Sequence, residues 1–593
     1  MKGWKGALRI AAAATMLAGT ALTPVVTPAI AKPTSQAQAR PNIVLIVLDD
    51  VGFAELGAFG SEIRTPHIDS LANNGLRYNR FDSKAICSST RAALLTGRNS
   101  QTVGMLDLAS GAAQPDPEAT GAQRGELPRN IETVAQSLKA AGYSTWALGK
   151  WHLAPKYDDA PGHDKGSWPL QRGFDHFYGF LRGWTDQYKP ELVKDNAPVP
   201  VPAKPGYHLT PDLIDQAIAA FGADTASGKD NPRFVYLALG TAHAPIQAPR
   251  SYIDAYGDTY AKGWDAIRAE RFARQKQLGI IPAATVLPPI NPGDRPWSSL
   301  TDQEKTVFAR FMATYAGFIT HADEEIGRLI AHLKQTGQYD NTLFVLLSDN
   351  GAAPESGQNG GFWKPYDPRT PVAEMARNLD KLGGPETQSL YQRPWAMAGV
   401  TPFRRYKLWP YAGGIRTPLI VSWNNGIKAK GSVRTQHVDA VDISPTLLDV
   451  AGTSFRTKAD GADLLPVAGR SIRASFTSST AGGRDVQFFA LRGNRAITVG
   501  DWKAVAIHSY GTDFAQDRWA LFNVARDFSE SEDLSARYPE KLKELQAIWW
   551  DEARKYSDPP LAEPAPQIRQ FRQYDDEFPP EGNSGVSGSP AKP

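Results

Sequence analysis

The 593-residue sequence predicts an α/β fold: a large mixed, mostly parallel sheet flanked by helices, with a smaller C-terminal α+β subdomain that contains an antiparallel sheet. Apolar runs such as 42–48 and 234–239 are typical of strands buried on both faces of a parallel sheet. Helical patterns alternate with these runs over roughly the first 450 residues, as in α/β domains. Near residue 480 the pattern changes to short strands joined by tight turns, which predicts hairpins.

The chain divides into a leader, a tether, a main domain, a subdomain and a tail. Lys2, Lys5 and Arg9 precede an alanine-rich apolar run that ends in a small-x-small cleavage site, which indicates a signal peptide. A membrane anchor is the alternative, but Pro24 and Pro28 interrupt the run and leave it too short. The predicted segments are 1–31 signal peptide, 32–40 tether, 41–480 main α/β domain, 481–560 C-terminal subdomain, and 561–593 tail with a disordered end.

These features predict an exported protein, periplasmic or secreted, with no membrane segment after cleavage. The leader carries three basic and no acidic residues, so its removal lowers the formal net charge from +3 to 0. No basic run is interleaved with aromatic residues, which excludes nucleic acid as an expected partner.

In chain order, the expected elements are defined by their apolar periodicity and by their end signals. Thr65 and Pro66 start a helix that Gly75 ends, and a second helix begins at Cys87. Expected strands cover 42–48, 143–148, 234–239, 341–347, 417–423, 495–499, 502–507 and 519–523. Further expected helices cover 131–141, 308–334, 442–451 and 539–556, and Pro- and Gly-rich excursions cover 154–210, 250–300 and 352–413.

Polar side chains follow four separate apolar strands: Asp49 and Asp50, Lys150 and His152, His243, and Asp349 and Asn350. Functional groups of such sheets gather at the carboxyl ends of the strands, so we expect these residues to meet. Turn and cap roles are the commoner fate of Asp-Asp and Asp-Asn-Gly taken singly. Two oxygen-donor pairs at strand ends instead favour a hard divalent cation, Ca²⁺ with Mg²⁺ as the alternative, over zinc.

Cys87 is the only cysteine, so the exported chain cannot form an internal disulfide. A buried inert thiol is the plain alternative to a reactive group. At the start of a helix, free N–H groups favour anions and activated nucleophiles, which points to a hydrolase of anionic esters. Arg91 lies one turn later on the same face. Lys150 and Lys407 would supply positive charge, and two histidines would supply proton transfer near neutral pH.

The sequence resembles the type I sulfatases of the alkaline-phosphatase superfamily, most closely the bacterial arylsulfatases, over nearly all of residues 41–560. The motifs that carry this resemblance are 41–50, 65–69, 87–97, 149–153, 242–245, 323–327, 348–351, 406–407, 413–418 and 500–503.

This resemblance implies that Cys87 is oxidised by a maturation enzyme to formylglycine, whose hydrate attacks the sulfur of a small-molecule sulfate ester. Its second hydroxyl lets the sulfate leave as the aldehyde re-forms. The resemblance also implies a role for each site residue. Asp49, Asp50, Asp349 and Asn350 bind Ca²⁺ with residue 87, Arg91 and Lys150 support the nucleophile, His152 assists hemiacetal collapse, and His243 with Lys407 holds sulfate and protonates the leaving alcohol.

One residue departs from the family pattern: Ser89 stands where Pro, or sometimes Ala, is usual. Aryl sulfates are the expected substrates, with a phosphate or phosphonate monoester hydrolase, or a silent anion-binding homologue, as the alternatives. The excursions are expected to line the cleft. Trp168, Trp184, Trp363 and Trp395 are candidate aromatic contacts, although packing is the commoner role.

Overall fold

A computed structural model describes Met1 and residues 40–111, 114, 121–160, 162–222, 231–459, 461–509, 511–557 and 561. Apart from Met1, the predicted signal peptide lies outside the described residues, and so does the tail beyond 561. From Arg40 onward the chain forms one unit. Within its described part, no helix is both long and apolar enough to cross a membrane.

The strands are β1 Asn42–Leu48, β2 Leu76–Tyr78, β3 Phe81–Asp82, β4 Ser144–Lys150, β5 His176–Phe180, β6 Val193–Lys194, β7 Ala197–Pro198, β8 Arg233–Ala238, β9 Thr342–Ser348, β10 Leu419–Ser422, β11 Ser432–Arg434, β12 Val438–Asp439, β13 Lys458–Ala459, β14 Ala462–Asp463, β15 Val486–Leu491, β16 Asn494–Val499, β17 Trp502–Ala506 and β18 Trp519–Asn523. The α-helices are α1 Pro66–Asn73, α2 Cys87–Thr96, α3 Val134–Ala140, α4 Leu209–Gly222, α5 Arg250–Asp254, α6 Gly263–Gln277, α7 Asp302–Gln335, α8 Val372–Arg377, α9 Arg393–Gly399, α10 Ala412–Ile415, α11 Ile443–Val450 and α12 Pro539–Tyr556.

A ten-stranded sheet in the order β11-β2-β10-β9-β1-β8-β4-β5-β6-β7 forms the centre of the fold. Strand β1 pairs in parallel with β8 and β9, and β4 pairs in parallel with β8 and β5. Strand β10 runs antiparallel to β9, and β6 runs antiparallel to β5. The sheet is therefore mixed and mostly parallel, which confirms the predicted fold class.

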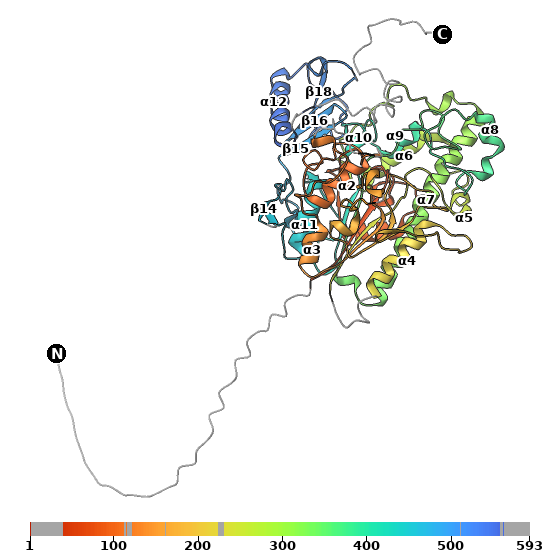
Figure 1. Ribbon diagram of the computed structural model, residues 1–593. Helices are drawn as coiled ribbons and strands as arrows, with labels where there is room; N and C mark the ends of the chain where they lie inside the picture. Colours follow the sequence, from red (N-terminus) through yellow and green to blue (C-terminus); the bar gives the residue numbers. More distant parts are fainter. Residues whose placement is uncertain are drawn as a thin grey trace. The chain divides into compact units, whose positions relative to one another are not determined.

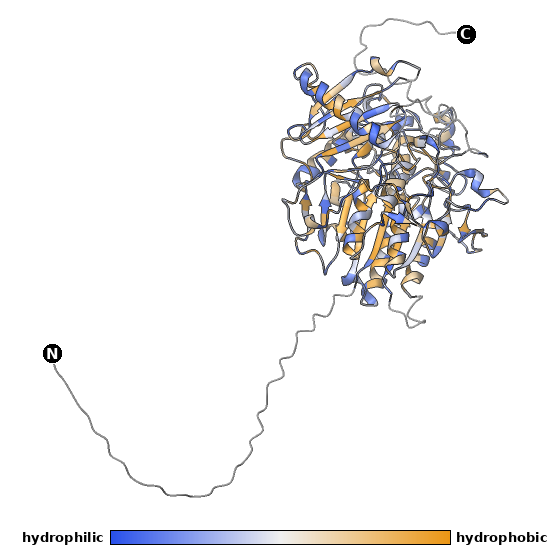
Figure 2. Ribbon diagram, turned by 60° about the vertical axis from the view of Figure 1, so that its left-hand side comes forward, coloured by the Kyte–Doolittle hydropathy of each residue, from blue (hydrophilic) through white to orange (hydrophobic). Residues whose placement is uncertain are grey.

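Both faces of this sheet are covered by helices, with α4 and α7 on one side and α3 and α11 on the other (Figure 1). Val44 and Ile46 of β1 belong to one hydrophobic core, whereas Leu45 and Val47 belong to the other. Each such side chain contributes about 1.5–3 kcal/mol by leaving water. Figure 2 shows the apolar strands at the centre of the sheet and more polar segments outside. The unbroken apolar runs of the sequence reflect this two-sided burial.

The C-terminal sheet β15-β16-β17-β18 is antiparallel, as predicted, and has a strand, β15, that the sequence pattern did not reveal. Phe489 faces the main core, while its neighbour Phe488 packs against Trp549 of α12. One face of this small sheet therefore packs against the main domain, and the other face packs against α12.

The excursions contain more regular structure than the sequence patterns indicated. Strand β5 extends the parallel sheet, although Gly179 interrupts its apolar run. Helix α6 was hidden because its buried face includes arginines, among them Arg271, whose guanidinium is paired with the carboxylate of Glu62 at 2.6 Å. Helix α7 starts six residues before the predicted start, because a capping box of Thr301 and Glu304 initiates it in a polar turn.

A buried ion pair joins the C-terminal sheet to the segment after Lys407. The Lys503 ammonium lies 2.6 Å from Glu530 Oε1, and both side chains are 1% exposed. The other Glu530 oxygen accepts a hydrogen bond from the backbone N–H of Ala412, the first residue of α10. The pair thus holds the start of α10 in place.

We expect Lys503→Met to lower the free energy of unfolding by about 3–5 kcal/mol, because it leaves the Glu530 carboxylate buried without its partner. Chemical denaturation measures this loss. Lys543→Met, which removes an exposed lysine paired with Glu540, is the matched control and should change stability by less than about 0.5 kcal/mol. Equal effects of the two changes would contradict the assignment.

Candidate active site

The two oxygen-donor pairs meet at the carboxyl edge of the central sheet. Asp49 and Asp50 follow β1 directly, and Asp349 and Asn350 follow β9, which pairs with β1 so that Leu48 and Ser348 are partners. The Asn350 side-chain amide donates to Asp50 Oδ1 at 2.5 Å, and the Asp50 backbone N–H donates to Asp349 Oδ1 at 3.3 Å. Asp50 has φ 60°, a left-handed conformation that Asp tolerates better than most residues.

Cys87 is the first residue of α2 and is 2% exposed. Its Sγ lies 3.1 Å from His152 Nδ1. Gly183 packs against the same imidazole, and a Cβ at residue 183 would stand 2.8 Å from the ring, so only glycine leaves His152 in this position. The thiol and the imidazole therefore face each other and are closely packed.

Arg91 lies one helical turn beyond Cys87, as predicted, but its hydrogen bonds go elsewhere. Nε and Nη2 donate to Asp349 Oδ2 at 2.9 and 2.7 Å, and Nη1 donates to the Lys150 carbonyl at 3.2 Å. Arg91 therefore ties α2 to the ends of β9 and β4. The structure shows no hydrogen bond from Arg91 to Cys87 among the described atoms.

Both predicted lysines reach the carboxylate cluster. Lys150, which is the last residue of β4 rather than a residue beyond it, lies 2.7 Å from Asp49 Oδ2. Lys407 lies 3.0 Å from Asp50. His243 Nε2 lies 3.6 Å from Asp50 Oδ2, while its Nδ1 is 2.7 Å from the Ala244 carbonyl. That carbonyl fixes the proton on Nδ1 and leaves Nε2 facing the site.

Burial dominates the protonation of the site. It raises the pKa of the Cys87 thiol to about 11, despite the ammonium groups of Lys150 and Lys407. Burial, with Lys150 nearby, lowers the pKa of His152 well below its usual value, and burial lowers that of His243 to about 3. We expected histidines that titrate near neutral pH, but both are neutral there.

The cluster has the features of a cation site. Asp49 Oδ1 and Asn350 Oδ1 are buried and have no hydrogen-bond partner among the described atoms. Ligand atoms of Asp49, Asp50 and His243 lie within 4.8 Å of one another. Burial raises the pKa of Asp49 to about 8, although the Lys150 ammonium beside it opposes this shift, so further positive charge would favour the ionised carboxylate. Three carboxylates and an amide fit a hard divalent ion.

Two site residues were missed by sequence reasoning, because they lie in an excursion without strand or helix periodicity. Glu355 Oε1 lies 2.9 Å from the Lys407 ammonium, and the Tyr366 hydroxyl is 3.5 Å from His243 Nε2. Their only signal was position, since Glu355 follows Asn350 closely in a segment expected to line the cleft.

The tryptophan candidates separate into core and surface positions. Trp395 is fully buried in an aromatic cluster with Trp264, and Trp168 is 3% exposed, so both are packing residues. Trp184 is 41% exposed, and Trp363 is half-buried with its indole N–H donated to Glu374 at 2.7 Å.

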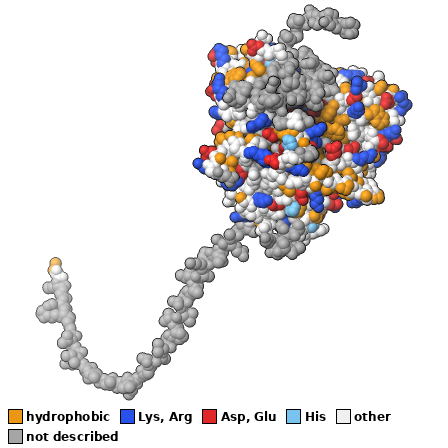
Figure 3. Space-filling view, viewed as in Figure 1, with side chains coloured by type: hydrophobic (Ala, Val, Ile, Leu, Met, Phe, Trp, Pro, Cys, Tyr) orange, Lys and Arg blue, Asp and Glu red, His pale blue; other side chains and the backbone are white. Residues whose placement is uncertain are grey.

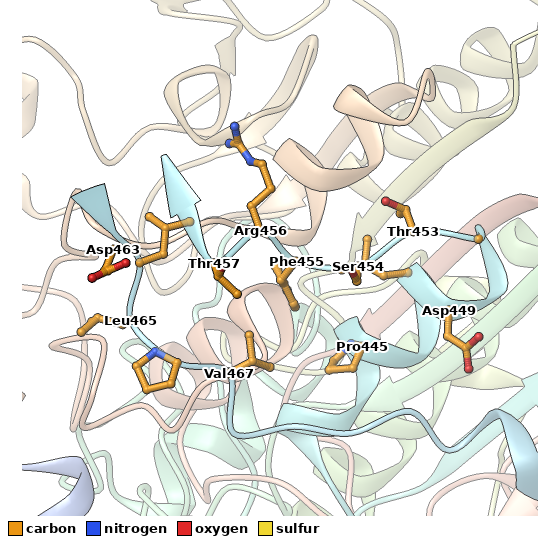
Figure 4. A pocket seen from close by; sticks show the side chains of 14 residues that line it. Pro445, Asp449, Thr453, Ser454, Phe455, Arg456, Thr457, Asp463, Leu465 and Val467 are labelled. Carbon is orange, nitrogen blue, oxygen red and sulfur yellow. The ribbon is translucent and has the colours of Figure 1, made fainter. Parts of the chain in front are cut away.

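A cavity of about 770 Å³ lies away from this cluster, and its lining contains none of the predicted site residues. Pro445, Phe455 and Val467 contribute to its apolar wall (Figure 4). On the face of the described chain shown in Figure 3, basic and acidic side chains are interspersed.

Two protein-family models match the chain. The sulfatase family model matches residues 41–453, and the model of the N-sulphoglucosamine sulphohydrolase C-terminal region matches 405–552. The chain belongs to the sulfatase family. Its motifs and fold make it a type I sulfatase of the alkaline-phosphatase superfamily, and family membership makes its reaction the hydrolysis of sulfuric esters.

Curated relatives of this sulfatase span most of its length. An uncharacterised sulfatase of Schizosaccharomyces pombe is 31% identical over 86% of this chain and 93% of its own. An arylsulfatase of Klebsiella aerogenes is 31% identical over 74% of this chain and 92% of its own. An N-acetylgalactosamine-6-sulfatase of Mus musculus is 26% identical over 84% and 76%.

Solved structures share its fold. Ps i-CgsB, crystallised with k-i-k-neocarrahexaose, has a TM-score of 0.61 at 23% identity, covering 91% of this chain and 98% of its own. The phosphonate monoester hydrolase of Agrobacterium radiobacter has a TM-score of 0.53 at 20% identity, covering 86% and 96%. At these identities the likeness establishes the fold alone.

Proposed function

We propose that this sulfatase is an exported arylsulfatase that cleaves the S–O bond of aryl sulfates with formylglycine at position 87 and a bound Ca²⁺. The observation that carries the proposal is the placement of Cys87. It starts α2, faces His152 at 3.1 Å, and stands within electrostatic reach of Lys150, Lys407, Asp49 and Asp349.

The side chain at position 87 needs conversion to act well, because burial holds the cysteine as a neutral thiol. Formylglycine, when formed, supplies a hydrated aldehyde whose oxygen is the nucleophile. His152 is neutral and has Nδ1 facing residue 87, so it is placed to hold a proton at that atom. The Ser88 hydroxyl donates to the His152 carbonyl at 2.8 Å and fixes the distance between helix and imidazole.

Asp49, Asp50, Asp349 and Asn350 would hold the cation through the oxygens described above. When bound, a divalent ion would supply positive charge that polarises the ester oxygens. We favour Ca²⁺ because it accepts many oxygen ligands in an irregular arrangement, whereas Mg²⁺ demands a near-ideal octahedron. Arg91 orients Asp349 by donating hydrogen bonds to its Oδ2, as residues that hydrogen-bond to metal ligands commonly do.

The leaving-group side of the site is formed by Lys407 and His243. The Lys407 ammonium remains charged, because Asp50 and Glu355 raise its pKa well above the usual value even though burial opposes this. It can therefore stabilise charge on the departing oxygen as a hydrogen-bond donor. Neutral His243 carries its proton on Nδ1, so its Nε2 faces the site as a hydrogen-bond acceptor.

Ser89 does not disturb the mature site. It lies in the first turn of α2, and its hydroxyl donates to the Leu106 carbonyl at 3.0 Å. Proline is also tolerated in a first helical turn, so either residue fits the folded protein. Ser89 instead affects the conversion of Cys87, because the maturation enzyme recognises this segment before the chain folds.

The aryl preference rests on the similarity to the Klebsiella arylsulfatase and is tested with a substrate panel. We expect kcat/KM to be highest for an aryl sulfate, lower for N-acetylgalactosamine 6-sulfate, and lowest for the matched aryl phosphate. A higher value for the aryl phosphate or aryl phosphonate would favour the alternative esterase, and no turnover of any ester would favour a silent anion-binding homologue. N-terminal sequencing of the exported protein tests the signal peptide, because cleavage after Ala31 would make Lys32 the first residue.

A further inference from the structure

Lys407 is shared between two carboxylates. Its ammonium lies 3.0 Å from Asp50 and 2.9 Å from Glu355 Oε1. Asp50 belongs to the cluster that fits a cation, and a bound ion would offset its charge. The Glu355 carboxylate does not belong to that cluster. Its negative charge therefore partly cancels the positive charge that Lys407 presents to a bound anion.

Glu355 is connected to residue 87 through Lys407, which pairs with Glu355 and interacts electrostatically with Cys87. It interacts electrostatically with Tyr366, which also interacts with Lys407 and Cys87 and whose hydroxyl is near His243. The second carboxylate oxygen, Oε2, is buried and has no hydrogen-bond partner among the described atoms. Because no hydrogen-bond donor among the described residues reaches Oε2, the negative charge of Glu355 is offset by Lys407 alone and acts on other ions nearby.

Charge separates the anions that reach such a site. A sulfate monoester or a phosphonate monoester carries one negative charge, whereas a phosphate monoester near pH 8 and the product sulfate carry two. A fixed carboxylate repels a dianion about twice as strongly as a monoanion at the same distance. In a buried site this difference is not removed by solvent screening.

We propose that Glu355 is a specificity-determining residue that disfavours dianions, so that the site rejects phosphate monoesters and releases the sulfate it forms. This inference deepens the proposed function and rests on it. The carboxylate acts through its charge, with no covalent step.

The test compares wild type with Glu355→Gln on aryl esters that share one phenol: the sulfate, the phenylphosphonate and the phosphate. We expect kcat/KM for the dianionic phosphate to rise by about tenfold or more relative to the sulfate, from one extra charge a few Å away. The ratio of the two monoanionic esters should stay within about twofold. Glu355→Ala removes the same charge and should move the phosphate ratio in the same direction. Glu374→Gln changes a carboxylate of the same excursion that pairs with Trp363, and should leave all ratios unchanged.

Equilibrium binding separates this inference from the proposed function. Calorimetry measures the binding of inorganic sulfate and of methanesulfonate to two proteins, Cys87→Ala and the double variant Cys87→Ala with Glu355→Gln. We expect the double variant to bind the dianionic sulfate about tenfold more tightly than Cys87→Ala does, with a smaller gain for the monoanionic methanesulfonate. If wild type hydrolyses no ester, the proposed function fails while this measurement still decides the role of Glu355. An unchanged dianion preference, or a phosphonate that follows the phosphate, would overturn the inference.

Discussion

Cys87→Ala lowers kcat/KM for an aryl sulfate by at least about 10⁴-fold, because it removes the atom from which the nucleophile is made. Binding groups remain: Lys150, Lys407 and His243 do not depend on the sulfur for their contacts with the carboxylates. KM should therefore change far less than kcat. Steady-state kinetics on protein with unchanged thermal stability measures both constants.

Cys87→Ser is the matched control for this prediction. Serine keeps one hydroxyl at the same backbone position but lacks the second hydroxyl of an aldehyde hydrate. It can accept the sulfuryl group but cannot expel sulfate by re-forming a carbonyl, so we expect one turnover followed by arrest. Continuous turnover by the serine variant, or full activity of the alanine variant, would contradict the assignment of the nucleophile.

Asp349→Ala should cause the largest combined loss of stability and metal binding. Asp349 Oδ2 accepts two hydrogen bonds from Arg91, which is fully buried, so the change leaves the guanidinium with only the more distant Asp49 carboxylate, 3.9 Å away. Breaking a buried pair in this way costs about 3–5 kcal/mol of folding free energy. The change also removes one of the four oxygen donors.

The calcium dependence of unfolding gives the readout for metal binding. In wild type, Ca²⁺ at about 1,000 times its dissociation constant should stabilise the fold by about 4 kcal/mol, and chelation should remove this gain. Asp349→Ala should show little calcium-dependent shift, and Asp349→Asn, which keeps size and an acceptor oxygen, should lie between. A calcium shift in Asp349→Ala equal to that of wild type would mean that the ion binds elsewhere.

The central sheet was readable from sequence because burial on both faces leaves an unmistakable apolar run, as in 42–48. The same logic located Asp50 and Asn350, since parallel strands bring their ends to one edge. The partner of Arg91 was not readable, because helical spacing gives the face of a side chain and not the strand end that it meets.

Residues of the 352–413 excursion show the limit of this reasoning. Lys407 was predicted as a source of positive charge, but Glu355 and Tyr366 were not foreseen, because an irregular segment has no periodicity to indicate direction. The neutral state of His243 was also beyond the sequence, since it follows from desolvation in the folded site.

Mass spectrometry of the tryptic peptide Ala85–Arg91, from protein purified in active form from its own cells, tests the central claim most directly. The account predicts an aldehyde, or its hydrate, at residue 87 in a proportion that matches specific activity across preparations. An unmodified thiol at position 87 in fully active protein would contradict it.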